Sequence, residues 1–336
     1  MIENGKRPQV ARRQPLVNNL LILEGISRTG KFLLADILNG FKDIEPVQSK
    51  AGSIEHIPVF ERFGLIERET AKELLRCEID VYCYEMLIGR NLNFRQSDKS
   101  SIFRVPNHQE LIKRCESEDD VLLNFYDHNV YSFFIAHELM PNIELHFETF
   151  PEMKVISNQR NPVDTVASLF KRGYAERINN DPKFFTIYMQ GESGPRPWYT
   201  LDWEEDFYSL NPMDRMIKSI ETLMKLNRES YIRLPPEQKK QILFVRYEDL
   251  LSQPEKVIVK IGQFLNRQPL QEMKLIIKRE NLPNQEKLDL RTDNLKGIKE
   301  LASSEYYQRL LNLEAEFNNE EGREAFEANY GLSDAR

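Results

Sequence analysis

The sequence has no long apolar run and very few cysteines. The apolar stretch at 20–23 is much too short to cross a bilayer, and no hydrophobic core of a signal peptide follows the basic first residues. The three cysteines are Cys77, Cys83 and Cys115, and their spacing fits neither a disulfide framework nor a metal motif. We therefore expect buried, reduced thiols in a soluble, cytoplasmic protein. The alternative is a luminal domain cut from a longer, membrane-anchored parent.

Excess positive charge is also lacking. The net charge is −7, which argues against non-specific nucleic-acid binding, so an anionic ligand needs a local cluster of cations. Repeats and low-complexity tracts are absent. With 336 residues, of which 40% are hydrophobic and 29% charged, the chain can bury a substantial core. We expect a flexible segment at 1–18 and a single domain at 19–332.

Apolar runs alternate with segments of helical periodicity. This order predicts an α/β fold with a central parallel sheet covered on both faces. Most of 54–114 has a helical pattern, interrupted by a polar loop at 91–101. The expected strands are 20–24, 43–48, 121–125, 154–157 and 242–246, and the main expected helices are 31–38, 130–139, 163–172, 213–231 and 255–265.

Two inserts interrupt this alternation, at about 50–118 and 173–211. The second is rich in aromatic residues among glycine and proline. Long loops of this kind often form lids or walls of binding sites. An equally good interpretation is a loop that packs its own aromatic side chains onto the core.

The segment Gly25–Phe32 (GISRTGKF) lies between an expected strand and an expected helix. Its glycines allow backbone N–H groups to converge on phosphate oxygens, and the helix presents its positive end to the anion. The segment matches the Walker A pattern through Lys31, but Phe32 replaces the hydroxyl residue that holds Mg²⁺. These features predict a P-loop-like three-layer fold without the usual nucleoside triphosphate chemistry. A glycine turn with an exposed lysine is the alternative.

A second motif, RNPVDTVAS, extends from Arg160 to Ser168. Pro162 suits the first turn of a helix, and Asp164 suits its positive end. Arg160 before the helix and Ser168 on its second turn are expected to hold one phosphate together.

Taken together, the two motifs resemble those of the sulfotransferase family. The first resembles the 5′-phosphosulfate loop, and the second resembles the 3′-phosphate motif R-[ND]-P-x-D-x-x-x-S at every position. The segment YEDL at 247–250 resembles a family segment that lies near adenosine, and Lys296-Gly297 is weakly similar to a late basic loop. The resemblance implies 3′-phosphoadenosine 5′-phosphosulfate as co-substrate, without a metal. The implied binding residues are Gly25, Ser27, Arg28, Thr29, Gly30, Lys31, Phe32, Arg160, Ser168, Tyr247, Lys296 and Gly297.

For catalysis, the resemblance gives Arg28 the task of stabilising the leaving phosphate, with Lys31 sharing it. The first candidate for the general base is His128, because it directly follows the expected strand at 121–125. The next candidates are Glu55, His56 and Glu45. Glu144, His146 and His137 are assigned to surface or packing positions, and Glu248 and Asp249 to orienting nearby groups.

The expected function is transfer of a sulfonate group to a hydroxyl or amine of a small-molecule or glycan acceptor. The acceptor itself stays open, because the inserts that would select it resemble nothing known. Two other classes are considered: a P-loop kinase or NTPase, favoured by Lys31 and opposed by Phe32, and a homologue that binds the nucleotide without catalysis.

Overall fold

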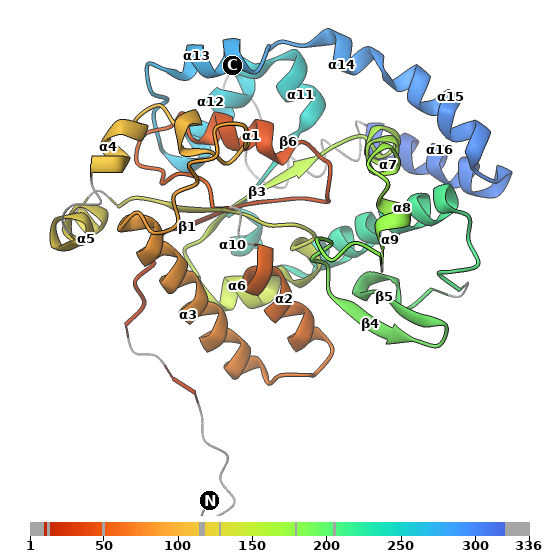
Figure 1. The fold of residues 1–336 in the computed structure, drawn as a ribbon, viewed down its shortest axis with the longest axis horizontal. Coiled ribbons are helices and arrows are strands. Elements are labelled where there is room, and N and C mark those ends of the chain that lie inside the picture. The colour runs from red at the N-terminus through yellow and green to blue at the C-terminus, as the bar shows by residue number, and fades with distance from the viewer. Residues whose placement is uncertain are drawn as a thin grey trace, which may run out of the picture.

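The computed structural model describes residues 10–11, 14–48, 51–113, 118–127, 129–178, 180–203 and 206–319. The main sheet has four parallel strands in the order β2-β1-β3-β6 (Figure 1). A two-stranded antiparallel hairpin lies apart from it. The strands are β1 (Leu20–Glu24), β2 (Ser132–Ile135), β3 (Lys154–Gln159), β4 (Tyr188–Gly191), β5 (Gly194–Pro197) and β6 (Ile242–Arg246).

Helices surround the main sheet and form most of the chain. They are α1 (Lys31–Leu38), α2 (Ala51–Arg62), α3 (Arg68–Leu87), α4 (His108–Lys113), α5 (Glu118–Asp127), α6 (Ile143–Thr149), α7 (Pro162–Lys171), α8 (Tyr174–Arg177), α9 (Pro212–Arg233), α10 (Pro236–Lys239), α11 (Tyr247–Ser252), α12 (Pro254–Leu265), α13 (Met273–Arg279), α14 (Gln285–Asp289), α15 (Arg291–Leu301) and α16 (Ser304–Asn318). Short 3₁₀ turns lie at Ile102–Arg104, Met140–Asn142 and Trp198–Thr200.

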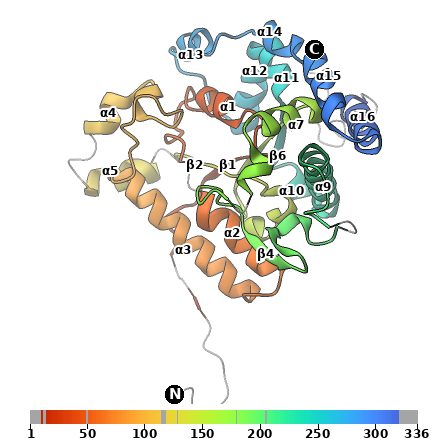
Figure 2. The same ribbon diagram turned by 45° about the vertical axis from the view of Figure 1, so that its right-hand side comes forward.

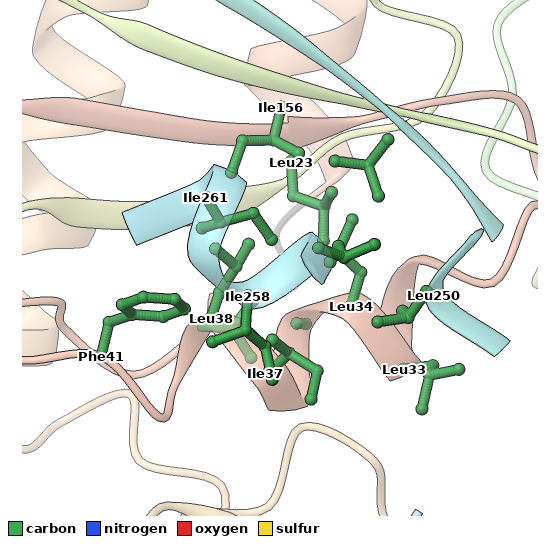
Figure 3. Close-up of a cluster of buried hydrophobic side chains, with 14 of the residues drawn as sticks. Leu23, Leu33, Leu34, Ile37, Leu38, Phe41, Ile156, Leu250, Ile258 and Ile261 are labelled. Atoms are coloured by element: carbon green, nitrogen blue, oxygen red, sulfur yellow. The ribbon is translucent and has the colours of Figure 1, made fainter. Parts of the chain in front are cut away.

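Side chains of β1 alternate between two cores, which explains why the whole strand is apolar until its last residue. Leu21 and Leu23 pack with α1 and α12, as Figure 3 shows for Leu23. Leu20 and Ile22 face the opposite side, where α3 and α6 pack. A strand covered on both faces needs apolar residues at successive positions. The fold is therefore the predicted α/β layered fold with a central parallel sheet.

A third core lies between α7, α9 and α16, and it also contains aromatic residues of the 173–211 insert. Figure 2 shows α15 and α16 beside α7. Two helices of this region begin at side-chain caps. The side-chain oxygen of Asn161 accepts a hydrogen bond from Val163 N at the start of α7, and Asn211 does the same for Met213 N at α9. In both helices a proline follows the cap.

The expected helices at 31–38, 163–172, 213–231 and 255–265 are confirmed within one or two residues, as are the strands at 20–24 and 242–246. The strand at 154–157 extends two residues further. The segment 43–48 forms two isolated bridges beside β2 and no strand, since Pro46 has no N–H for a continuous ladder.

Two neighbouring predictions were wrong. The expected strand at 121–125 is part of helix α5, where Val121 and Phe125 are buried and Leu123 is exposed at 62%. The expected helix at 130–139 contains strand β2, whose four residues are all buried. Short apolar runs have no decisive period, so the sequence could not distinguish the two structures.

The expectation that the cysteines are buried is confirmed for one of them. Cys83 is buried, Cys77 is exposed on α3, and Cys115 lies outside the described residues. Within the described part of the chain, no helix is both long and apolar enough to cross a membrane.

Candidate active site

The loop that joins β1 to α1 lies at the carboxyl end of the sheet. Three of its residues have positive φ angles: Gly25 at 151°, Arg28 at 73° and Gly30 at 95°. A side chain at either glycine would collide with the protein, since a Cβ on Gly25 would lie 2.5 Å from Asn158 O. A loop with left-handed residues before a helix turns its N–H groups toward one point, as anion-binding loops do.

Tyr247 closes one side of this loop. A Cβ on Gly30 would lie 2.4 Å from Tyr247 Cδ2, so the phenol ring packs directly on the loop backbone. The guanidinium of Arg160 lies over the same ring at 4.7 Å from its centroid. The glycine, the tyrosine and the arginine come from three separate motifs, and the fold brings them into one site.

Arg28 contacts both Arg160 and Ser168, the two residues that we expected to hold one phosphate together. Arg28 Nε donates to Ser168 Oγ at 3.1 Å, and Arg160 Nη1 donates to Arg28 O at 3.0 Å. The buried Arg160 Nε has no hydrogen-bond partner among the described residues. Burial lowers the pKa of Arg28 from its ordinary value, and the neighbouring Arg172 and Arg160 lower it further. An anion placed here would relieve this repulsion.

Acidic residues behind this cluster are already paired. Asp164 accepts from Arg291 Nη2 at 3.0 Å and from Asn294 Nδ2 at 2.9 Å. Glu248 Oε1 accepts from the Asn161 backbone at 2.9 Å, which fits the orienting role expected for it. The cations that face the loop therefore keep their charge available for a ligand.

Lys31 lies inside the loop. Its side chain is buried, and its Nζ donates to Gly25 O at 2.5 Å and to Ile26 O at 3.0 Å. Burial lowers the pKa of Lys31, and the nearby Glu138, Glu24 and Glu55 oppose that shift. Its contacts support the loop backbone. The ammonium is not presented to the open side of the loop, where we expected it to share the charge of a leaving phosphate.

Other predicted loop residues also serve the loop itself. The buried hydroxyl of Thr29 donates to Ile26 O at 2.9 Å. The backbone N–H of Ser27 donates to Glu138 Oε1 at 2.9 Å. Phe32 is half-buried and packs against the core between α1 and α12.

Lys296 and Gly297 do not lie in a loop. Both are exposed residues of α15, whose hydrogen bonds to Asp164 of α7 come from Arg291 and Asn294. The similarity to a late basic loop misled because the segment RTDNLKGIKEL is helical throughout.

The first candidate for the base, His128, lies outside the described residues. The argument for it fails, because the strand expected before it is helix α5. Glu45 is also misplaced, since its N–H bonds to Tyr131 O at the amino end of β2, opposite the loop.

His137 lies where we expected the base, just after the carboxyl end of a strand in the parallel sheet. It follows β2 by two residues, and its Nδ1 lies 3.0 Å from Glu55 Oε1. The same carboxylate accepts the His137 backbone N–H at 2.5 Å. The next residue, Glu138, holds the phosphate loop at Ser27. No described residue is hydrogen-bonded to His137 Nε2. The signal for His137 was its place after the run SFFI, which we had predicted to be helical.

His56 lies one residue beyond Glu55 but has a different partner. Its Nε2 is 2.7 Å from Phe185 O, in the aromatic insert. His56, His137 and the insert residue Trp198 line a narrow cavity of about 20 Å³. The structure thus brings Glu55, His56 and His137 together at the edge of the insert, which we expected to be a binding wall or a packed loop.

Comparisons with known proteins identify the family of the chain. A family model described as the sulfotransferase domain matches residues 133–309, slightly more than half of the chain. The chain therefore belongs to the sulfotransferase domain family. No curated protein matches it significantly.

Solved structures of sulfotransferases are distantly similar. The sulfotransferase domain from the curacin biosynthetic pathway has 15% identity and a TM-score of 0.41, covering 76% of this chain and 77% of its own. Sulfotransferase STF9 from Mycobacterium avium has 12% identity and a TM-score of 0.37, with coverages of 79% and 68%. A retinol dehydratase in complex with androsterone and the inactive cofactor PAP has 14% identity and a TM-score of 0.31, with coverages of 95% and 82%.

Proposed function

We propose that the protein transfers a sulfonate group from 3′-phosphoadenosine 5′-phosphosulfate to a hydroxyl or amine of an acceptor. The observation that carries the proposal is the pairing of two anion sites. One is the loop at Gly25–Lys31, and the other is the Arg28–Arg160–Ser168 cluster beside it. A nucleotide with phosphates at both its 5′ and 3′ positions needs such a pair.

The residues present fit this donor. The unpartnered Arg160 Nε and the mutual repulsion of Arg28, Arg160 and Arg172 call for an anion. Tyr247 packs on the loop and lies under Arg160, so it helps to hold this arginine beside the loop. The donor supplies an activated sulfonate on its 5′-phosphate.

Proton removal is assigned to His137. The Glu55 carboxylate fixes the ring through Nδ1, which leaves Nε2 to accept the acceptor's hydroxyl proton. As the new O–S bond forms, the bond between sulfur and the phosphate oxygen breaks. The N–H groups of Ser27 and Thr29 already have partners, so the other loop N–H groups stabilise the charge that returns to that oxygen, and Arg28 of the same loop assists.

A calorimetric titration tests the nucleotide assignment. We expect 3′,5′-adenosine bisphosphate to bind in EDTA, and at least about 10-fold more tightly than AMP, because a charge-assisted contact to the second phosphate is added. Equal affinity for the two nucleotides would contradict the assignment. Tight binding of ATP that requires Mg²⁺ would favour the kinase alternative. Tight binding of the bisphosphate without sulfation of any acceptor would favour a non-catalytic homologue.

A further inference from the structure

A cavity of about 490 Å³ opens between the first turn of α1, the segment 46–48 and the segment 86–102. Its volume lies in the range of small-molecule sites. Phe32 in its wall directly follows Lys31 of the phosphate loop. Gln48, also in the wall, pairs with Phe134 of β2, three residues before His137. The cavity therefore begins beside the candidate transfer site.

The wall formed by 86–102 is anchored to α1. Arg104 Nε donates to Asp36 Oδ1 at 3.1 Å, and Asp36 is only 1% exposed. Ile102 N donates to Asn93 O at 2.8 Å, and Ile102 packs in a small core with Val105 and Leu111. Figures 1 and 2 both show the connection between α3 and α4 beside α1. These contacts fix this wall of the cavity against α1.

Gln48 supplies an unused hydrogen-bonding group. Its side chain is 3% exposed, and its amide oxygen has no hydrogen-bond partner among the described residues. A buried amide oxygen without a partner is unfavourable, and Gln48 is one of the residues that line the cavity. A ligand hydroxyl that reaches this wall would satisfy the amide.

Two arginines and one aspartate line another part of this cavity. Arg90 and Arg95 are exposed, and no ion pair joins either of them to a described carboxylate. The Ser100 backbone lowers the pKa of the third residue, Asp98, and the charge of Arg95 lowers it further. Asp98 Oδ1 is instead used locally, since it accepts from Ser100 N at 3.2 Å and from the Ser100 hydroxyl at 3.3 Å. Arginine recognises carboxylates through paired N–H donors, so this wall suits an acid group.

We propose that this cavity binds the acceptor, and that the acceptor is a polyhydroxylated acid such as a saccharide with a uronic acid. Its carboxylate would lie at Arg90 and Arg95, one hydroxyl at Gln48, and the hydroxyl to be sulfated at His137. Gln48 pairs with Phe134, and His137 lies three residues further along the chain, so the acceptor extends over about 10 Å. This inference rests on the proposed function and adds the class of its acceptor.

Two probes that differ only at the acid test the inference: 4-nitrophenyl β-D-glucuronide and 4-nitrophenyl β-D-glucoside. Each is titrated calorimetrically with 3′,5′-adenosine bisphosphate present, and each is assayed for sulfation with the radiolabelled donor. We expect the glucuronide to bind at least about 10-fold more tightly than the glucoside. Arg90→Gln and Arg95→Gln should each reduce glucuronide affinity by about 10-fold and leave glucoside affinity unchanged. The exposed Arg228 of α9 provides the control, since Arg228→Gln should change neither affinity.

The possible results distinguish a failure of this inference from a failure of the proposed sulfotransferase function. Binding of the glucuronide that depends on both arginines, without any sulfate transfer, supports the acid-selective cavity and contradicts the proposed transfer. Sulfation of the glucoside at an equal or higher rate, unaffected by the arginine variants, overturns the cavity inference and leaves the transferase function standing. Failure of both probes to bind also overturns the inference. Melting temperatures of Arg90→Gln and Arg95→Gln that equal the parent's exclude a loss of folding as the cause of weaker binding.

Discussion

At the scale of single residues, substitution of Arg160 tests the second anion site. Its guanidinium contacts the loop through Arg28 O and stacks on Tyr247, while its Nε has no partner among the described residues. Arg160→Ala should weaken binding of 3′,5′-adenosine bisphosphate by about 10- to 100-fold in calorimetry, because a charged hydrogen bond contributes about 1.5–3 kcal/mol. Ser168→Ala should cost less, since its hydroxyl is neutral. AMP affinity should barely change. If both variants bind the two nucleotides as the parent does, the 3′-phosphate site lies elsewhere.

His137 and its neighbour Glu55 test the proton transfer. His137→Asn keeps a hydrogen-bonding side chain but removes the proton acceptor, so kcat should fall by about 100-fold or more while nucleotide affinity stays constant. Glu55→Gln should lower kcat less, because it only weakens the group that orients the ring. The matched control is His56→Asn, since His56 bonds to Phe185 O. The measurement is initial rate with any acceptor that the parent sulfates. A larger loss in His56→Asn than in His137→Asn would move the base to His56.

At the scale of elements, the β1–α1 loop depends on two glycines with positive φ. Gly30→Ala would force a Cβ into the Tyr247 ring at a φ of 95°, and we expect a loss of about 1–3 kcal/mol in the free energy of unfolding. Nucleotide affinity should fall as well, since the loop must shift. The matched control is Gly297→Ala in α15, where nothing lies within 4 Å of the new Cβ. That change should stabilise the protein by about 0.5–1 kcal/mol. Urea denaturation gives the free energy of unfolding of both variants. Equal changes in Gly30→Ala and Gly297→Ala would show that the loop does not require a glycine at position 30.

At the scale of the whole molecule, the pH dependence of stability reports on the buried His146 of α6. Its side chain is fully buried, and this burial lowers its pKa to about 4. The unfolded chain takes up a proton near pH 6.5, so it binds more protons than the native state between pH 6.5 and about 4. The contribution of neutral His146 is therefore complete above pH 6.5 and is lost as the pH falls toward 4.

Replacing His146 by Leu removes this titration. Between pH 7.5 and pH 5, the parent should lose about 2 kcal/mol more of its free energy of unfolding than His146→Leu does. Urea denaturation of both proteins at the two pH values gives this difference, from which the other titrating groups cancel. Parallel losses in the two proteins would mean that His146 is protonated in the native state.

The sequence by itself determined the elements with strong local signals. The strand at 20–24, the glycine loop and the following helix were predictable because the phosphate-loop pattern is contained in a few consecutive residues. The turn from β3 into α7 was equally clear, since Pro162 suits the first turn of a helix and Asp164 suits its positive end. The α/β class followed from the alternation of these elements.

Only the tertiary structure decided which side chains meet at the site. The run before His137 is a strand because it pairs with β1, over a hundred residues earlier in the chain, and no local period shows this. Arg28 and Ser168 are 140 residues apart in sequence, and Glu55 and His137 are 82 apart. The direction of Lys31 likewise depends on the packing around the loop. Such contacts depend on how distant segments pack together, which the residue types at each position do not specify.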